Sequence, residues 1–291
     1  MNTLRALLKT MRPQQWTKNI FIFAALIFDV KLLEATYATR TVLGFVLFCL
    51  TSGAIYTIND LVDLEKDRLH PRKKHRPLPS GRLKPQTAII AAAVLGIGSL
   101  VAGFLLDPGF GIVLLGYLIL QLAYSFKLKN IVLIDVMAIA AGFVLRVAGG
   151  SPLVGSAISP WLYLCTVLLA LFLALSKRRG ELIALGSEAG SHRPILRQYN
   201  VVLLDQLNGM VTASIILAYG LYTFAGPNLP TNYSTMLTIP FVIYGLFRYL
   251  YLIHVQKCTL APDEVLLADR PLQMDLVLWG LSWVLILYLL P

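Results

Sequence analysis

Long apolar runs separated by short charged loops dominate the sequence and limit what the chain can fold into. A helix needs roughly 20 apolar residues to cross the hydrocarbon core of a bilayer. Since lipid leaves no partner for an unpaired backbone polar group, such runs cross as helices. The chain is 57% hydrophobic and 14% charged, which excludes a soluble globular protein. We interpret the sequence as an all-α integral membrane protein, a bundle of about nine transmembrane helices. Its apolar runs lie at about 19–33, 41–59, 87–106, 110–126, 131–149, 158–176, 207–226, 234–255 and 271–290.

The basic residues are distributed unevenly between the two sides of this bundle. With the N-terminus in the cytoplasm, nine spans place 21 of the 25 Lys and Arg residues on one side. By the positive-inside rule that side is cytoplasmic. We therefore expect a multi-pass plasma-membrane protein whose polar loops face the cytoplasm and cap a central cavity. The cytoplasmic segments are 1–18, 60–86, 127–130, 177–206 and 256–270, of which 1–18 reads as an interfacial segment.

The net charge of +10 does not indicate nucleic-acid binding. The basic residues lie in short loops between spans, where attraction to anionic lipid and to anionic substrates explains them better. A Gly- and Ala-rich helix face at 138–142 suits helix packing within one protomer or between protomers. The expected partners are thus the membrane and an anionic substrate, and a homo-oligomer stays open.

An acidic motif closes the second apolar run and carries the strongest signal for chemistry. If the helix continues for two turns, Asn59, Asp63 and Asp67 stand at i, i+4 and i+8, with Asp60 beside them. Oxygen ligands gathered on one helix face suit Mg²⁺, which completes its coordination shell with substrate phosphates. We therefore interpret these four residues as a magnesium site, with Asp60, Asp63 and Asp67 catalytic.

Basic residues follow the acids within 60–86, among them Arg68, Lys73 and Arg76. They are placed to face an anion that the metal holds. The alternative is a solvated loop with internal ion pairs, which does not explain the helical spacing of the acids.

Further polar residues close the fourth run and open the fifth. Lys127 and Lys129 either anchor the loop at the membrane surface or neutralise a diphosphate leaving group. Asp135, about one turn inside the fifth run, is expected to pair with a base or a metal. Arg146, farther along that run, is expected to pair with a carbonyl or extend outward rather than to bind substrate.

A second polar cluster follows the sixth run, where basic residues outnumber acids. Such a cluster binds anions, because Arg presents paired donors to phosphate oxygens; a basic loop touching lipid headgroups is the alternative. The residues of the second cluster are Lys177, Arg178, Arg179, Glu181, His192, Arg193 and Arg197.

Near the eighth and ninth runs, extension toward water and helix capping explain Arg248 and Asp269.

These motifs resemble the UbiA superfamily of intramembrane prenyltransferases over nearly the whole chain. The acidic motif at the end of the second span, the nine helices and Tyr124-x-x-Lys127 carry the resemblance. It implies a single transmembrane domain over 1–291, with active-site loops at 60–86 and 177–206 above a membrane-open cavity for an isoprenoid. The chain departs from the aromatic prenyltransferases of the superfamily, because Lys177-Arg-Arg-Gly-Glu181 replaces their second Asp-rich motif.

With this departure and its further motifs, the sequence is similar to one branch of the superfamily, the decaprenyl-phosphate phosphoribosyltransferases. The branch implies Mg²⁺-dependent transfer of 5-phosphoribose from phosphoribosyl pyrophosphate to a polyprenyl phosphate, for cell-wall arabinan precursors. Its further motifs here are Arg12-Pro-x-Gln-Trp16-x-Lys18-Asn19, Asp67-Arg-x-His-Pro-x-Lys-x-x-Arg76, Ser191-His-Arg-Pro-x-Leu-Arg197-x-Tyr199 and Asp269-Arg-Pro-Leu272.

The resemblance also implies roles for individual residues. The acidic motif would hold Mg²⁺ on the pyrophosphate, with Lys127 catalytic beside it. The implied substrate-binding residues are Lys18, Asn59, Arg68, Lys73, Arg76, Tyr124, Lys129, Lys177, Arg178, Glu181, His192, Arg193 and Arg197.

Two alternatives stay open. A UbiA-type prenyltransferase would alkylate an aromatic or glycerol-phosphate acceptor with a prenyl diphosphate, and the missing second Asp-rich motif counts against it. A lipid or ion transporter would show paired broken helices in both halves, and the sequence has no such pattern.

Overall fold

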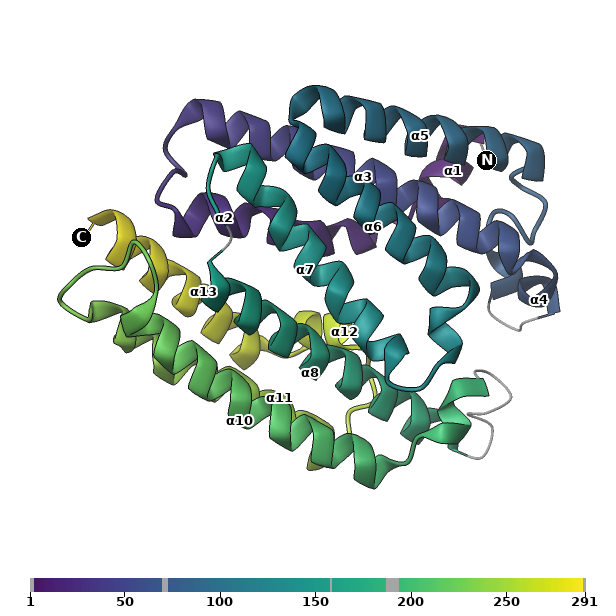
Figure 1. Ribbon diagram of the computed structural model, residues 1–291. Helices are drawn as coiled ribbons and strands as arrows, with labels where there is room; N and C mark the ends of the chain where they lie inside the picture. The colour runs from purple at the N-terminus through teal and green to yellow at the C-terminus, as the bar shows by residue number, and fades with distance from the viewer. Residues whose placement is uncertain (1–2, 70–72, 158, 187–193, 290–291) are drawn as a thin grey trace. The chain divides into compact units, whose positions relative to one another are not determined.

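All regular elements of the computed structural model, which describes residues 3–69, 73–157, 159–186 and 194–289, are helices (Figure 1). Within these residues eight helices are long and apolar enough to cross a membrane. The predicted all-helical membrane fold is thereby confirmed. The chain divides into two compact units. Unit 1 comprises Met1–Ile27, Lys31–Phe126 and Leu145–Ala157, and unit 2 comprises Phe28–Val30, Lys127–Val144 and Ile158–Pro291.

Unit 1 is built around two long helices that lie side by side, α3 and α5 (Figure 1). The face of α5 toward the core carries small residues, including Ala92, Gly96 and Ser99, which let two helices approach closely. Thr51 of α3 and Ser99 share a hydrogen bond of 2.8 Å. In chain order the unit contains α1 (Thr3–Thr10), the 3₁₀ helix η1 (Pro13–Ile22), most of α2 (Phe23–Phe28), α3 (Ala35–Val62), α4 (Leu64–Leu69), η2 (Lys73–His75), α5 (Pro85–Leu106), α6 (Pro108–Phe126) and the C-terminal part of α7 (Ile134–Val154).

α3 is longer than the hydrocarbon core of a bilayer. Its 28 residues extend about 42 Å at 1.5 Å each. The apolar part of a bilayer is only about 30 Å thick. The polar C-terminal end of α3, which carries Asn59 and Asp60, can therefore reach water while the apolar part spans.

The first apolar run, 19–33, does not form the single helix that the sequence predicts. Pro13 begins η1, which occupies ten residues, and α2 adds six more. A 3₁₀ helix rises about 2.0 Å per residue, so the two together extend about 29 Å. The predicted interfacial helix is also shorter than 1–18 and ends at Thr10. Arg12 adopts a left-handed conformation (φ 53°) directly before Pro13, which breaks the helix there.

Unit 2 is organised around α8 and α10, which also lie side by side (Figure 1). The predicted capping at 269 is confirmed: Asp269 accepts a hydrogen bond from the Leu272 amide (2.9 Å) and caps α13. Arg248 also donates to Asp269 (2.8 Å), and this hydrogen bond lowers the pKa of Asp269. The unit contains η3 (Leu128–Asn130), the N-terminal part of α7, α8 (Pro160–Leu185), η5 (Pro194–Gln198), α10 (Val201–Ala225), η6 (Ser234–Thr238), α11 (Ile239–His254), α12 (Pro262–Ala268), α13 (Arg270–Val284) and the π-helical turn η7 (Leu285–Leu289).

A buried tyrosine holds α10, η6 and α13 together, and its loss gives a first prediction. The hydroxyl oxygen of Tyr219 accepts hydrogen bonds from the indole nitrogens of Trp279 (2.8 Å) and Trp283 (2.9 Å) and bonds Thr238 (2.6 Å). Tyr219→Phe would leave these donors unpaired, at a cost of about 1–3 kcal/mol for each one that stays buried. We expect a clear fall in the thermal unfolding midpoint of the detergent-solubilised protein. Tyr244→Phe, at a tyrosine 47% exposed, is the matched control, and an equal midpoint for the two variants would contradict this account.

Candidate active site

The acidic motif keeps its helical spacing, although the helix is interrupted once. α3 ends at Val62 and α4 begins at Leu64. Hydrogen bonds of helical type nevertheless continue through the break, from the Asp63 amide to the Asn59 carbonyl (3.0 Å) and from the Asp67 amide to the Asp63 carbonyl (2.8 Å). The predicted i, i+4, i+8 register is therefore present in the backbone.

Two of these carboxylates are buried and share one cation. Nη1 of Arg76 donates to Asp60 Oδ1 at 3.2 Å and to Asp67 Oδ2 at 2.7 Å. Arg12 also donates to Asp60, and Lys73 Nζ lies 3.5 Å from Asp67 Oδ1. Both carboxylates are buried, whereas the Arg76 side chain is 33% exposed. Asp60 and Asp67 thus lie close enough to bind a single positive charge between them.

Local structure fixes the two arginines on this site. The left-handed turn at Arg12 joins α1 to η1, and its guanidinium also lies over the Tyr56 ring, 5.0 Å from the ring centre. Arg76 is followed by a loop that is anchored in a small core through the buried Leu78 and Leu83. Gly81 permits the turn between those leucines because it adopts φ 75°. In the sequence, the motif Arg12-Pro-x-Gln-Trp16-x-Lys18-Asn19 is the signal that points to Arg12.

The other predicted residues of unit 1 lie in different surroundings. Arg68 pairs with Glu65 on the surface of α4 (2.8 Å). Lys18 is half-buried on η1, and Tyr124 is half-buried near the end of α6. These positions do not test the predicted substrate contacts, which stay predictions.

Unit 2 contains a second arginine that links two carboxylates, at the cytoplasmic end predicted for α8. Nε of Arg178 donates to Asp135 Oδ2 (2.7 Å), and Nη1 donates to Glu181 Oε2 (2.6 Å). The side chains of Arg178 and Asp135 are 1% and 0% exposed. The other oxygen of Asp135 accepts a hydrogen bond from the hydroxyl of Tyr199 (2.6 Å). The expectation that Asp135 pairs with a base is confirmed.

Among the other predicted cations of unit 2, Arg179 is buried and pairs with Asp205, whereas four others are exposed or half-buried. Lys127 is exposed just before η3, Lys129 is half-buried within it, and Lys177 is half-buried on α8. Arg197 is exposed on η5. The predicted residues His192 and Arg193 lie outside the described residues.

Arg146 of unit 1 is buried in a polar cluster of neutral side chains. Its Nε donates to Asn19 Oδ1 (2.8 Å) and its Nη2 to the Tyr117 hydroxyl (2.7 Å). The expectation that it pairs with a carbonyl is confirmed in the form of the Asn19 side-chain amide. A Cβ atom at Gly150 would clash with the Ile22 carbonyl oxygen, so the backbones of α7 and η1 approach closely here.

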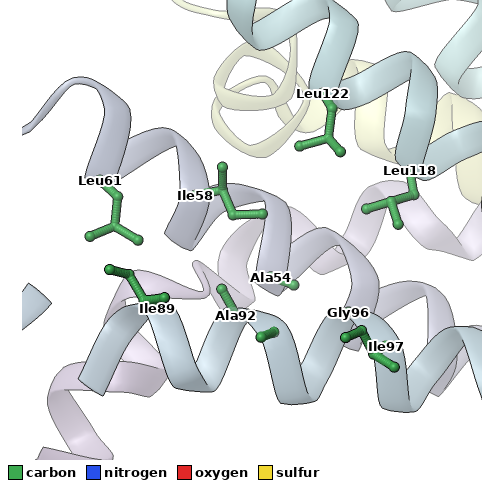
Figure 2. A pocket seen from close by; sticks show the side chains of 10 residues that line it. Ala54, Ile58, Leu61, Ile89, Ala92, Gly96, Ile97, Leu118 and Leu122 are labelled. Carbon is green, nitrogen blue, oxygen red and sulfur yellow. The ribbon is translucent and has the colours of Figure 1, made fainter. Parts of the chain in front are cut away.

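An apolar groove of about 410 Å³ lies among α3, α5 and α6 of unit 1. Figure 2 shows Ile58 and Leu61 of α3 together with Ile89 and Ile97 of α5 and Leu118 and Leu122 of α6. On a helix with 100° per residue, Ile58 and Leu61 point away from Asn59 and Asp63. The groove and the acidic motif therefore occupy different faces of α3.

The acidic motif has suitable donors for Mg²⁺ but does not form a complete cage. Within the described residues, no group of three or more His, Cys, Asp or Glu side chains is arranged to hold a metal. Mg²⁺ is typically held by one or two carboxylates together with substrate phosphates. Asp60 and Asp67, which already share the Arg76 cation, fit that arrangement.

Comparison with known proteins assigns the chain to a family. The model of the UbiA prenyltransferase family matches residues 20–261. The chain belongs to the UbiA prenyltransferase family. Membership identifies a multi-pass membrane transferase.

Several relatives are similar to this UbiA family member over most of their length. Decaprenyl-phosphate phosphoribosyltransferase from Mycolicibacterium smegmatis is 32% identical over 96% of this chain and 91% of the relative. The protein of the same name from Corynebacterium glutamicum is 31% identical over 100% of this chain and 89% of the relative. A solved UbiA homolog from Archaeoglobus fulgidus, bound to DMAPP and Mg²⁺, superimposes with a TM-score of 0.75 at 18% identity, covering 97% of this chain and 99% of that one. This structural similarity confirms the predicted UbiA-like fold.

Proposed function

We propose that this UbiA family member transfers 5-phosphoribose from phosphoribosyl pyrophosphate to a polyprenyl phosphate such as decaprenyl phosphate, releasing pyrophosphate. The relatives named decaprenyl-phosphate phosphoribosyltransferase, at about 30% identity over nearly the whole chain, support this choice of substrates. The reaction forms a bond between an oxygen of the lipid phosphate and the anomeric carbon of the ribose. It breaks the bond between that carbon and the pyrophosphate oxygen.

The observation that favours this reaction is the difference between the two arginine-bridged acid pairs. Arg76 is 33% exposed, so the cation that bridges the buried Asp60 and Asp67 lies nearer to water than Arg178 does. Arg178 is 1% exposed and forms a buried pair with Asp135, where loss of one partner is costly, and it also pairs with the partly exposed Glu181. In unit 2, Asp135 and Glu181 therefore pair with Arg178, and we propose that other Lys and Arg side chains of this unit bind substrate. One metal site with surplus cations suits a sugar diphosphate donor and a phosphate acceptor.

Asp60 and Asp67 are the carboxylates that would hold Mg²⁺ on the donor pyrophosphate, with Asn59 and Asp63 completing the proposed set. When bound there, Mg²⁺ would neutralise negative charge that grows on the leaving pyrophosphate. Arg76 and Lys73 lie directly beside the two carboxylates and can donate to phosphate oxygens at the same place.

Other basic side chains of the protein would provide the remaining contacts to phosphate groups in the proposed reaction. Lys127 and Lys129 would stabilise the leaving group, while Lys177 and Arg197 would bind the sugar phosphate or the acceptor phosphate. The acceptor needs no general base, since a phosphate monoester loses its second proton near pH 6. We propose that these loops face the cytoplasm across the plasma membrane, where the positive-inside rule places them.

A transfer assay tests the proposal directly. Purified protein, Mg²⁺, radiolabelled phosphoribosyl pyrophosphate and decaprenyl phosphate are expected to give labelled lipid in the organic phase. EDTA is expected to lower the rate by about 100-fold or more, because metal stabilisation of a leaving group contributes several kcal/mol. A parallel reaction with a prenyl diphosphate and an aromatic acid tests the rival chemistry. Product in that reaction alone would overturn the proposed donor and acceptor.

A further inference from the structure

A leucine with a left-handed backbone stands at the entrance to α7. Leu133 has φ 65°, a conformation that costs an L-residue roughly 1–2 kcal/mol. Its amide donates a hydrogen bond of 2.8 Å to the hydroxyl oxygen of Tyr199. A side chain 66 residues away thus holds the strained residue in place.

The tyrosine is itself fixed by the buried ion pair of unit 2. Its hydroxyl donates to Asp135 Oδ1 (2.6 Å), while Arg178 holds the other oxygen of that carboxylate (2.7 Å). Burial and the hydrogen bond to Asp135 raise the pKa of Tyr199 to about 12. The hydroxyl therefore keeps its proton at neutral pH and can donate to Asp135 while it accepts from Leu133.

This contact ends a short segment that carries two of the proposed phosphate ligands. Lys127 and Lys129 precede Leu133, and the segment is closed by backbone hydrogen bonds from Asn130 to Lys127 (3.1 Å) and from Ile131 to Leu128 (3.2 Å). The next bonds, from Asp135 to Ile131 (3.0 Å) and from Met137 to Leu133 (3.0 Å), connect the segment to the first turn of α7. Fixing Leu133 therefore fixes the angle at which the lysine segment leaves α7.

We propose that Tyr199 is a positioning residue that holds Leu133 in its left-handed conformation and thereby orients Lys127 and Lys129 toward pyrophosphate. The holding role follows from contacts within unit 2, and the identity of the anion rests on the proposed function. Tyr199 does not need to touch substrate for this role.

Amide hydrogen exchange on Tyr199→Phe tests the holding role without any reference to activity. The variant keeps the ring but loses the hydroxyl, so the peptide covering 127–134 is expected to exchange faster than in the wild type. Peptides from α3 and α5 are expected to exchange unchanged. Tyr163→Phe, at a half-exposed tyrosine on α8 of the same unit, is the matched control. Unchanged exchange over 127–134 in Tyr199→Phe would overturn the proposal, whatever the activity.

Kinetics test what the segment is oriented for. Tyr199→Phe is expected to lower kcat for phosphoribosyl transfer by about 10- to 100-fold, the usual effect of a small misplacement of catalytic groups. The KM for the donor is expected to change much less, since leaving-group charge grows in the transition state. Faster exchange with an unchanged kcat would overturn the assignment of the two lysines. A wild-type enzyme without transfer activity would instead contradict the proposed function and leave the exchange result standing.

A second variant separates this mechanism from a general loss of structure. Glycine adopts a positive φ without steric cost, so Leu133→Gly removes the strain that Tyr199 holds. Adding Leu133→Gly to Tyr199→Phe is expected to restore a large part of kcat. Equal kcat values for the single and double variants would contradict a role through the backbone of residue 133.

Discussion

Replacement of Arg178 by methionine is expected to lower the free energy of unfolding by about 3–5 kcal/mol, among the largest single effects in this protein. The substitution would leave Asp135, which is fully buried, without the guanidinium that lies 2.7 Å away. An ionised carboxylate in such surroundings is costly, and a hydrogen bond from Tyr199 offsets only part of that cost. Denaturant or thermal unfolding of the detergent-solubilised protein measures the effect.

A double-mutant cycle identifies the source of this loss. Asp135→Asn removes the charge and keeps the shape, so Arg178→Met with Asp135→Asn is expected to be more stable than Arg178→Met alone. Arg5→Met, at an exposed arginine of α1, controls for the loss of an arginine. If Arg178→Met were as stable as Arg5→Met, the ion pair would not be the structural centre of unit 2. The proposal that Asp60 and Asp67 hold the metal, rather than Asp135 and Glu181, would then lose its support.

The fold was largely predictable because lipid imposes a strong constraint on sequence. Apolar runs of sufficient length identify helices without knowledge of tertiary contacts, and within the part of the chain that the structure describes eight of the predicted spans appear as long helices. The exception is 19–33, where hydrophobicity predicts burial but does not distinguish a 3₁₀ helix from an α-helix. Pro13, which begins the 3₁₀ helix η1, was the local sequence signal, and it does not affect a count of apolar residues.

The acidic part of the site was predictable for a similar reason, since helical periodicity is local. Asn59, Asp63 and Asp67 follow one register, and a single break at Asp63 does not disturb it. The ion-pair partners were not predictable, because they are distant in sequence. Arg12 reaches Asp60 across 48 residues, and no spacing rule connects them.

The same limit applies in unit 2, where the sequence suggested substrate contacts for Arg178 and Glu181. A basic cluster next to a membrane span looks the same whether its cations point to solvent or to an internal acid. Only the fold shows that Asp135, 43 residues from Arg178, receives that guanidinium. The exposed fraction of a side chain therefore distinguishes a cation that pairs with an internal acid from one that faces water. Composition alone does not make this distinction.

Replacement of Asp67 by asparagine is expected to reduce kcat for phosphoribosyl transfer by about 10²–10³-fold. Loss of one carboxylate from a metal site removes several kcal/mol of transition-state stabilisation. The fold should tolerate the change, because Arg76 still pairs with Asp60 at 3.2 Å and reaches water. Single-turnover transfer with labelled donor measures the rate, and Mn²⁺ binding followed by electron paramagnetic resonance measures the metal site independently.

Glu65→Gln is the matched control for Asp67→Asn, since Glu65 is a carboxylate on the same short helix. Its side chain is 79% exposed and pairs with Arg68 on the surface. It is therefore expected to leave both transfer and Mn²⁺ binding within about twofold of the wild type, because exposed ion pairs contribute little. If Asp67→Asn behaved like Glu65→Gln in both measurements, Asp67 would not be a metal ligand. If it lost transfer but kept Mn²⁺ affinity, its role would instead lie in holding Arg76 and Lys73 toward the donor, since both cations contact its carboxylate.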